Sequence, residues 1–154
     1  MIFLTRRATF SASHYYWNEA WSAEKNEQVF GRCANRNGHG HNYTLEVTVA
    51  GETDPVTGFV VDLKWLKDVI EREVLSAYDH RHLNLEASEF KNAIPTTENI
   101  AIAAWQRLEP AINSGGRGSG DGGSECGEAA GGAKLSRIRV YETPEIFAEY
   151  RGEA

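Results

Sequence analysis

Residues 39–49 alternate between two kinds of side chain, and this alternation constrains the fold more than any other feature of the sequence. The odd positions are histidine, tyrosine or aliphatic, whereas the even positions from 42 to 48 are polar: Asn42, Thr44, Glu46 and Thr48. Successive side chains of a β-strand point to opposite faces, so this period of two predicts a strand with one buried face. Other elements must then cover that apolar face.

Further extended segments are predicted on either side of this strand. Ile2–Ala12 is rich in β-branched and aromatic residues and predicts a strand. Trp17–Phe30 is polar and aromatic without a clear period, and we expect a loop there. Turn-forming residues at 54–58 precede Phe59–Val61, which predicts the returning arm of a hairpin.

Two amphipathic helices are predicted in the middle of the chain. The first begins after Asp62, whose side chain can accept a backbone N–H as an N-cap, and runs to about Tyr78 with apolar residues at three- and four-residue spacing. The second begins at Thr96 or Thr97, either of which can cap it, and Pro110 limits its extent.

The last part of the sequence returns to strand patterns. Leu135–Glu142 alternates like the central strand, and Ile146–Arg151 predicts a short final strand. A strand, a hairpin, two helices and two more strands in this order indicate an α+β fold, with antiparallel strands and the helices on one face of the sheet.

A glycine-rich tract interrupts this pattern between the second helix and the last strands. Nine of the 15 glycines lie within residues 113–133, which lack apolar periodicity and bulk. Such a segment cannot bury enough apolar surface to offset the entropy lost on ordering, so we expect it to be disordered. The other 133 residues, an ordinary size for one domain, must carry the fold and the function.

Charge and composition exclude several functional classes. The formal net charge is −6 and no run of Lys or Arg is longer than two, so a nucleic-acid-binding surface is not expected. No stretch approaches the length of an apolar membrane span, and the first residues lack the apolar segment of a secretory signal. With only Cys33 and Cys126 available for pairing, we expect a reduced, cytoplasmic protein.

The histidines indicate a metal site. His39 and His41 lie two residues apart on the predicted central strand, so both rings point to one face, and His14 at the end of the first strand offers a third nitrogen. Three histidines with an open fourth position are the pattern of a catalytic zinc site. The alternative is that His39 and His41 form a solvated strand end and that His14 is an unrelated surface residue.

Three further groups suit catalysis or binding. Cys33 is flanked by Arg32 and Arg36, and a thiol beside cations and a metal ionises more easily, which suits a base or a nucleophile. Asp79–His80 joins a carboxylate to an imidazole, an arrangement that moves protons, and Glu142 ends an alternating strand. The alternatives are structural: a small buried thiol, a histidine stabilised by a helix C-terminus, and a solvated carboxylate.

Taken together and in this order, these clusters resemble the 6-pyruvoyltetrahydropterin synthase family. The resemblance covers nearly the whole chain outside residues 113–133. It rests on six motifs: FSASH at 10–14, FGRCANRNGHGHNY at 30–43, DPVTGFVVDL at 54–63, DHRHLN at 79–84, PTTENIA at 95–101 and VYET at 140–143. Six motifs in register are far more specific than any one of them.

The resemblance implies a role for each matching position. Three residues would bind Zn²⁺: His14, His39 and His41. Cys33 would act as the catalytic base, and Asp79 with His80 would relay protons. Glu142 would anchor the pterin, because a carboxylate accepts two parallel N–H groups from the edge of the ring. A further segment would line the pterin pocket: Thr96, Thr97 and Glu98.

The resemblance also implies the fold, the assembly and the reaction. The expected fold is a four-stranded antiparallel sheet with two helices on one face, the tunnelling fold. Its subunits would form trimeric barrels that stack as a homohexamer, with active sites between subunits. The implied reaction is the zinc-dependent conversion of 7,8-dihydroneopterin triphosphate to 6-pyruvoyltetrahydropterin with elimination of triphosphate, a step of tetrahydrobiopterin biosynthesis.

Two alternatives remain open. The 6-carboxytetrahydropterin synthase of queuosine biosynthesis shares the fold, the zinc site and the substrate. Its cysteine usually lies closer to the His-Gly-His motif, however, whereas here five residues, Ala34–Gly38, separate Cys33 from that motif. The other alternative is a non-catalytic, zinc-stapled oligomer that only binds pterins, in which Cys33, Asp79 and His80 would have no purpose.

Overall fold

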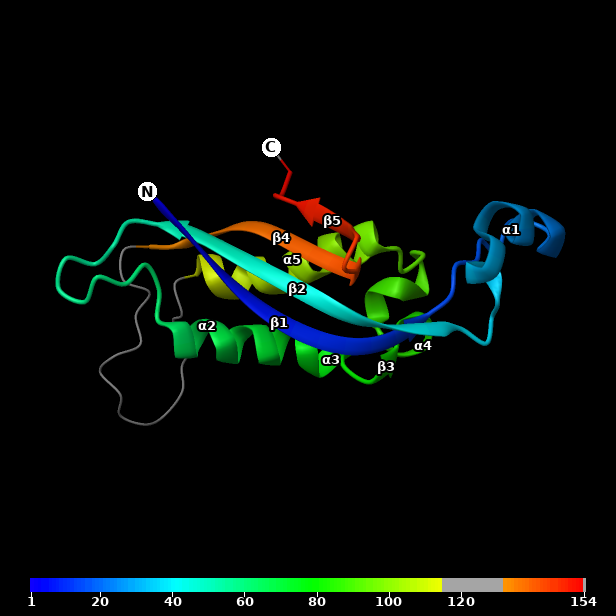
Figure 1. Ribbon diagram of the computed structural model, residues 1–154, viewed down its shortest axis with the longest axis horizontal. Coiled ribbons are helices and arrows are strands. Elements are labelled where there is room, and N and C mark those ends of the chain that lie inside the picture. Colours follow the sequence, from blue (N-terminus) through cyan, green and yellow to red (C-terminus); the bar gives the residue numbers. More distant parts are fainter. Residues whose placement is uncertain (115–131, 154) are drawn as a thin grey trace.

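The main element of the fold is one β-sheet (Figure 1). The computed structural model describes residues 1–114 and 132–153. The sheet has the strand order β3-β1-β2-β4-β5, and its strands are β1 (Ile2–His14), β2 (His39–Gly51), β3 (Arg81–His82), β4 (Lys134–Thr143) and β5 (Ile146–Tyr150). The four longer strands pair antiparallel, and the predicted α+β class is confirmed.

The expected four-stranded antiparallel sheet is wrong in one respect, because a fifth strand makes the sheet mixed. β3 has only two residues and pairs in parallel with β1, which places Arg81 opposite Ala12 and His82 opposite Ser13. The sequence around β3 is polar and has no apolar alternation. Its pairing with β1 therefore depends on where the preceding helix ends.

The longest pairing joins β1 to β2, from Ile2 opposite Gly51 to His14 opposite His39. The predicted alternation in β2 is confirmed by its fully buried odd positions: Tyr43, Leu45, Val47 and Val49. The opposite face is covered by long side chains of neighbouring strands. Arg7 Nη2 lies 2.7 Å from the Glu46 carboxylate, which is therefore buried as well.

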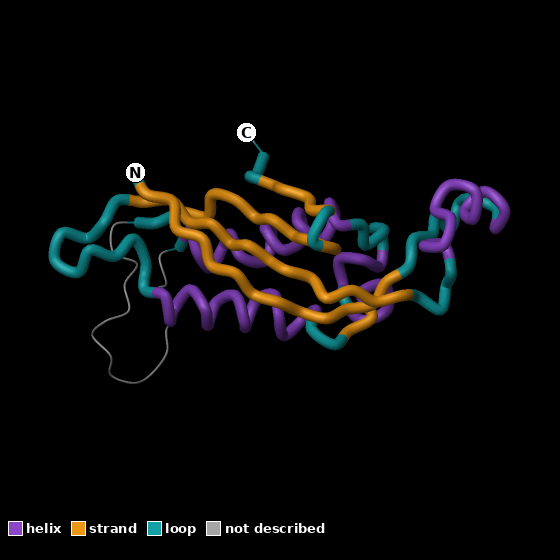
Figure 2. Tube along the Cα trace, viewed as in Figure 1, coloured by secondary structure: helices purple, strands orange, loops and turns teal. Residues whose placement is uncertain are grey.

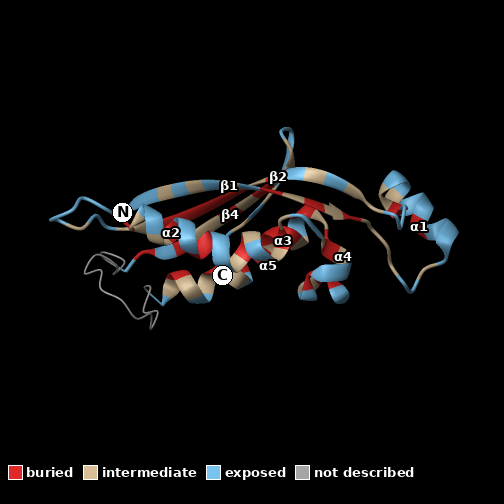
Figure 3. Cartoon of the chain, turned by 90° about the horizontal axis from the view of Figure 1, so that it is seen from below, coloured by how far each residue is buried: buried red, intermediate tan, exposed pale blue. Residues whose placement is uncertain are grey.

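The helices cover the apolar face of the sheet (Figure 3). A continuous helical segment consists of α2 (Leu63–Ile70), a π-helical turn (Glu71–Leu75) and α3 (Ser76–Tyr78). Beside it lies α5 (Thr97–Asn113). A short helix α4 (Leu83–Glu86) and a 3-10 turn (Ser88–Lys91) connect β3 to α5.

None of the helices in the described part of the chain has both the length and the apolar composition of a membrane span.

Both predicted helix starts are observed. Asp62 caps α2 by accepting the N–H of Trp65 at 2.7 Å, and Thr96 caps α5 through its hydroxyl. The expectation that Pro110 limits the second helix is wrong, because α5 continues to Asn113. The proline removes one backbone hydrogen bond, but Ile112 beyond it is only 1% exposed, and its burial offsets that loss.

The segment Trp17–Phe30, expected to be a loop, contains the helix α1 (Ala23–Phe30). This helix lies at the far end of the β1–β2 ribbon, away from the other helices (Figure 2). Ser22 caps it, and the buried side chain of Asn26 bonds to the backbone of Asn18 and of Ser22. Because polar contacts rather than an apolar stripe hold α1, hydrophobic periodicity missed it.

Phe59–Val61, expected as the returning arm of a hairpin, does not form a strand. Both edges of β2 are already paired, one with β1 and the other with β4, so no backbone edge is free. Val60 and Val61 instead pack into the core just before α2, at 3% and 1% exposure.

An ion pair ties α5 to the turn that follows α4. Arg107 binds both carboxylate oxygens of Glu89, with Nη2 3.0 Å from Oε2, and the Tyr78 hydroxyl donates to Oε1 at 2.6 Å. Burial alone would raise the pKa of Glu89, but the hydrogen bonds from Arg107 and Tyr78 outweigh it and hold the pKa at about 2. Since Tyr78 ends α3, the network fixes the place at which the chain leaves the helix.

Disorder was expected over residues 113–133, of which residues 115–131 lie outside the described residues. At the ends of the tract the expectation is wrong, because Asn113 is the last residue of α5 and Ala133 is buried in the core. The two ends of this segment are adjacent in the fold. Asn113 at the end of α5 accepts two hydrogen bonds, from Lys134 Nζ and from the Leu135 N–H, each 2.9 Å long. The described residues on the two sides of this segment are therefore in direct contact.

Glu89→Gln is expected to destabilise the fold by about 2 kcal/mol at neutral pH, because it leaves the Arg107 charge without its partner. A carboxylate with a lowered pKa stabilises the folded state above its ordinary pKa. The difference between wild type and variant should therefore shrink as the pH falls from 4.5 towards about 2. Thermal unfolding across this range measures it. Asp68→Asn, which breaks an exposed pair with Lys64, is the control and should change little. An equal effect of both variants would contradict the prediction.

Replacing residues 115–131 with a short Gly–Ser linker is expected to keep the fold and to leave the unfolding midpoint unchanged or slightly higher. A shorter loop loses less entropy on closing, and Asn113 still joins the two flanks. Asn113→Ala in the same shortened chain should cost about 1 kcal/mol, because the Leu135 N–H loses its acceptor. Circular dichroism melts check both chains, and unfolding of the linker variant would show that the tract is needed.

Candidate metal centre and active site

Three histidines meet at the end of the β1–β2 ribbon. His14 is the last residue of β1 and lies opposite His39, the first residue of β2, and His41 shares the face of His39. One ring nitrogen from each residue lies within 4.8 Å of the others, so the group can hold a metal ion. The sequence predicted this set of three residues, and the structure brings it together.

The surroundings of His14 fix which nitrogen it presents. Its Nδ1 lies 2.8 Å from the Pro95 carbonyl oxygen, which can only accept, so Nδ1 carries the proton. Nε2 is left as an acceptor that faces His39 Nε2 at 3.1 Å. Burial lowers the pKa of His14 to about 4, and burial and His41 also lower the pKa of His39. Neutral rings are the form in which histidines bind metals.

The donor set fits a transition metal. His41 Nε2 is buried and has no hydrogen-bond partner among the described residues. A buried nitrogen without a partner is costly, and a cation shared with the other two rings would satisfy it. Three imidazole nitrogens suit zinc and leave a fourth position open for substrate.

Glu142 on β4 lies directly beside this cluster. Its Oε1 is 3.6 Å from His41 Nε2, and its Oε2 accepts hydrogen bonds from Thr97 at 2.6 Å and from the Tyr16 hydroxyl at 3.3 Å. The carboxylate is only 16% exposed. Thr97 is therefore a neighbour of the site, whereas the Thr96 hydroxyl caps α5 and Glu98 is exposed.

Cys33 lies in a 3-10 turn (Gly31–Ala34) that follows α1, and it is a half-buried free thiol. Its carbonyl accepts the N–H of Tyr16 at 2.7 Å. Contrary to the expectation from neighbouring arginines, burial and the Glu142 carboxylate raise the pKa of the thiol. Arg36 gives no help because it pairs with Glu19 and lies over the Trp17 ring, 4.7 Å from its centroid.

Asp79 and His80 form the predicted pair at the exit from α3. Asp79 accepts the Ser11 N–H at 2.8 Å through Oδ1 and lies 3.0 Å from His80 Nδ1 through Oδ2. The Ser11 N–H and His80 lower the pKa of Asp79. His80 has a φ of 58°, a strained backbone conformation for a residue other than glycine, and its side chain is 82% exposed.

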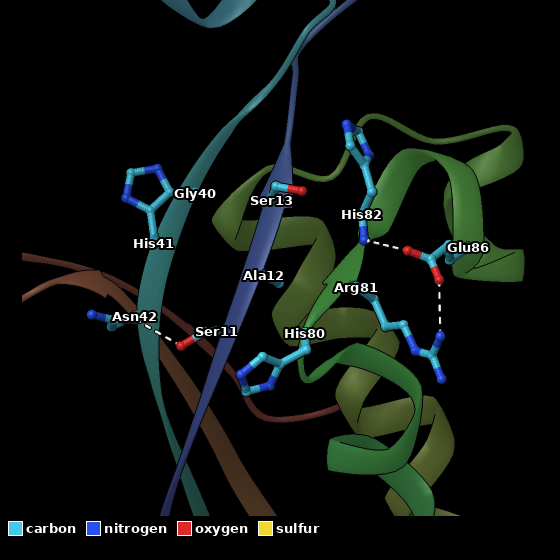
Figure 4. A pocket seen from close by; sticks show the side chains of 10 residues that line it. All are labelled: Ser11, Ala12, Ser13, Gly40, His41, Asn42, His80, Arg81, His82 and Glu86. Atoms are coloured by element: carbon cyan, nitrogen blue, oxygen red, sulfur yellow. Dashed lines mark hydrogen bonds and ion pairs between the residues drawn. The ribbon is translucent and has the colours of Figure 1, made fainter.

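This pair is not brought to the histidine cluster within one chain. His80 lines a shallow hollow with Ser11 and Ser13, which alternate along β1 with the residues that face the helices. His41 also borders the hollow, but its ring points away from His80 and β1 runs between the two (Figure 4). The hollow and the metal cluster therefore lie on opposite faces of the ribbon.

The sequence reasoning missed two residues that contact the cluster. The Tyr43 hydroxyl lies 3.2 Å from His14 Nδ1, and the Tyr16 ring meets His14 edge-on with centroids 5.0 Å apart. Tyr43 continues the alternation of His39 and His41, so the signal was present. Tyr16 follows the end of a strand in a segment without a period, and only the fold places it here.

Comparison with known proteins agrees with this geometry. The family described as 6-pyruvoyl tetrahydropterin synthase matches residues 3–153. The human 6-pyruvoyl tetrahydrobiopterin synthase is 37% identical over 150 residues, which are 97% of this chain and 91% of that protein. The structure of the Caenorhabditis elegans 6-pyruvoyl tetrahydropterin synthase superposes with a TM-score of 0.82 at 34% identity, covering 99% and 96% of the two chains.

A relative with a different activity also matches over most of its length. A dihydroneopterin monophosphate aldolase of Pyrococcus furiosus is 31% identical over 143 residues, 93% of this chain and 91% of that protein. The family model, however, matches nearly all residues of this chain, and the named synthases are 34–37% identical to it over nearly its whole length. The chain belongs to the 6-pyruvoyl tetrahydropterin synthase family of pterin-biosynthesis enzymes.

Proposed function

We propose that this enzyme uses Zn²⁺ to convert 7,8-dihydroneopterin triphosphate to 6-pyruvoyltetrahydropterin, with release of triphosphate. The observation that carries the proposal is the Glu142 carboxylate beside the three-histidine cluster, 3.6 Å from His41. The carboxylate and the metal are close enough to bind one small molecule together. Glu142 would bind the polar edge of its ring, and the metal would bind its reacting side chain. The proposed product is the one in the name of the Caenorhabditis elegans synthase.

Glu142 would recognise the pterin ring. A carboxylate accepts two parallel N–H bonds, and Oε1 has no donor within hydrogen-bond distance among the described residues. Thr97 donates a hydrogen bond to the other oxygen at 2.6 Å and so restrains the carboxylate. In this arrangement the anchor is ready before the substrate arrives, which lowers the entropy lost on binding.

His14, His39 and His41 would hold the zinc ion, which as a Lewis acid would make the C–H bonds next to the substrate's hydroxyl groups more acidic. The Pro95 carbonyl keeps His14 in the tautomer that this requires. Cys33 would be the base that takes a carbon-bound proton. Its reduced thiol also fits the reducing cytoplasm expected from the sequence.

Asp79 and His80 would serve a neighbouring subunit. The pair is exposed, is separated from its own metal cluster by the β-ribbon, and is already joined by a 3.0 Å contact suited to proton transfer. Assembly of several copies would give this pair a metal site to act on. This supports the homohexamer, and the barrel built from its sheets, that the family resemblance implies.

His41→Ala is expected to lose zinc, because three ring nitrogens are the smallest set that holds the ion firmly. The content should fall from about one ion per chain to well below half after dialysis, measured by elemental analysis. His82→Ala is the matched control, because its ring lies outside the cluster, and it should keep its zinc. Equal zinc in both variants would contradict the ligand assignment.

Mass spectrometry of the reaction with 7,8-dihydroneopterin triphosphate is expected to find triphosphate and 6-pyruvoyltetrahydropterin. Cys33→Ala should lower kcat by about 100-fold or more, as expected for loss of a general base, while zinc is retained. Cys126→Ala, the other cysteine of the chain, is the control and should turn over normally.

The alternatives give different products in the same assay. Acetaldehyde together with 6-carboxytetrahydropterin would identify the carboxy enzyme. In a second reaction with dihydroneopterin monophosphate in place of the triphosphate, side-chain cleavage would instead indicate an aldolase, like the Pyrococcus furiosus relative. Absence of any turnover by the zinc-loaded protein would leave only pterin binding, and full activity of Cys33→Ala would refute its role as the base.

A further inference from the structure

Tyr16 contacts three parts of the candidate site. Its N–H donates to the Cys33 carbonyl at 2.7 Å, and its hydroxyl donates to Glu142 Oε2 at 3.3 Å. Its ring meets His14 edge-on, with ring centroids 5.0 Å apart. One residue thus joins the turn that carries Cys33, the Glu142 carboxylate and the metal cluster.

The Tyr16 ring also contacts an aromatic residue of α1. Phe30, the last residue of α1, meets it edge-on at 5.9 Å, and Trp21 stacks on Phe30 at 5.8 Å. Aromatic pairs at these separations prefer such geometries, so the three rings restrict one another. The Tyr16 hydroxyl is therefore aimed at Glu142 by packing and by the backbone bond to Cys33 together.

Tyr16 and Thr97 together restrict the orientation of the Glu142 carboxylate. Thr97 and Tyr16 both donate to Oε2, and two donors on one oxygen restrict rotation of the carboxylate about its Cγ–Cδ bond. With Thr97 alone the plane can still turn about that single hydrogen bond. The second donor selects one plane, and a flat ligand edge that forms two parallel hydrogen bonds needs the plane to be set.

We propose that Tyr16 is a positioning residue for pterin recognition, whose hydroxyl sets the plane of the Glu142 carboxylate. The inference rests on the proposed function in so far as Glu142 is the pterin anchor. Tyr16 does not take part in the chemical step. Its loss should weaken binding of the ring and leave the rate of the bound substrate almost unchanged.

Tyr16→Phe is the sharpest test, because it removes the hydroxyl and keeps the ring packing and the backbone N–H. The dissociation constant of neopterin, followed by its fluorescence, should rise about threefold to tenfold, the effect of one modest hydrogen bond to a charged group. KM for 7,8-dihydroneopterin triphosphate should rise by a similar factor, with kcat within about twofold of wild type. Tyr15→Phe, the neighbouring tyrosine, is the control and should bind neopterin normally.

A double-mutant cycle shows whether Tyr16 acts through Glu142. In a Glu142→Gln background, Tyr16→Phe should have no further effect on neopterin binding, because the group that it orients has been replaced. An equal loss in both backgrounds would overturn the proposal, and so would unchanged binding by Tyr16→Phe. A fall in kcat without a change in KM would also overturn it. The neopterin measurement needs no turnover, so a failure of the proposed reaction is distinguished from a failure of this inference.

Discussion

The antiparallel pairing of β1 with β2 is the constraint on which the rest of the structure depends. Its register places His14 opposite His39, and the period of two then turns His41 to the same face. A slip by one residue would move both β2 histidines to the other face of the sheet and would also expose the apolar row behind them. Packing such as the stack of Phe10 on Tyr43, at 4.9 Å, therefore protects the metal site as well as the core.

The remaining parts of the site come from two elements far along the chain. The start of α5 contributes twice, because the Pro95 carbonyl fixes the tautomer of His14 and the Thr97 hydroxyl holds Glu142. Glu142 itself is delivered by β4, which pairs with the other edge of β2. The sheet thus sets where the ligands are, and the helix start sets how they are oriented. This division explains why the cap of α5 and the site occupy the same few residues.

Much of the fold was predictable where one local period is dominant. The alternation of β2 and the apolar stripe before Tyr78 arise from side chains a few residues apart, and both elements form as expected. The helix α1 was missed because buried Asn26 and other polar contacts hold it. The residue types predicted the Asp79–His80 pair, but they did not predict its position in the fold. The short parallel strand β3 and the strained φ of His80 put it on the face away from the cluster.

The sequence by itself determined the α+β class, the face shared by His39 and His41, and the set of chemical groups available to the site. These follow from periods of two and of three to four residues, which reflect the local geometry of the backbone. Only the tertiary structure decided that Tyr16 joins Cys33 to Glu142 and that Asp79 lies apart from its own metal cluster. Such contacts depend on how strands pair and where helices pack. They join residues with no fixed spacing along the chain, so no local pattern in the sequence records them.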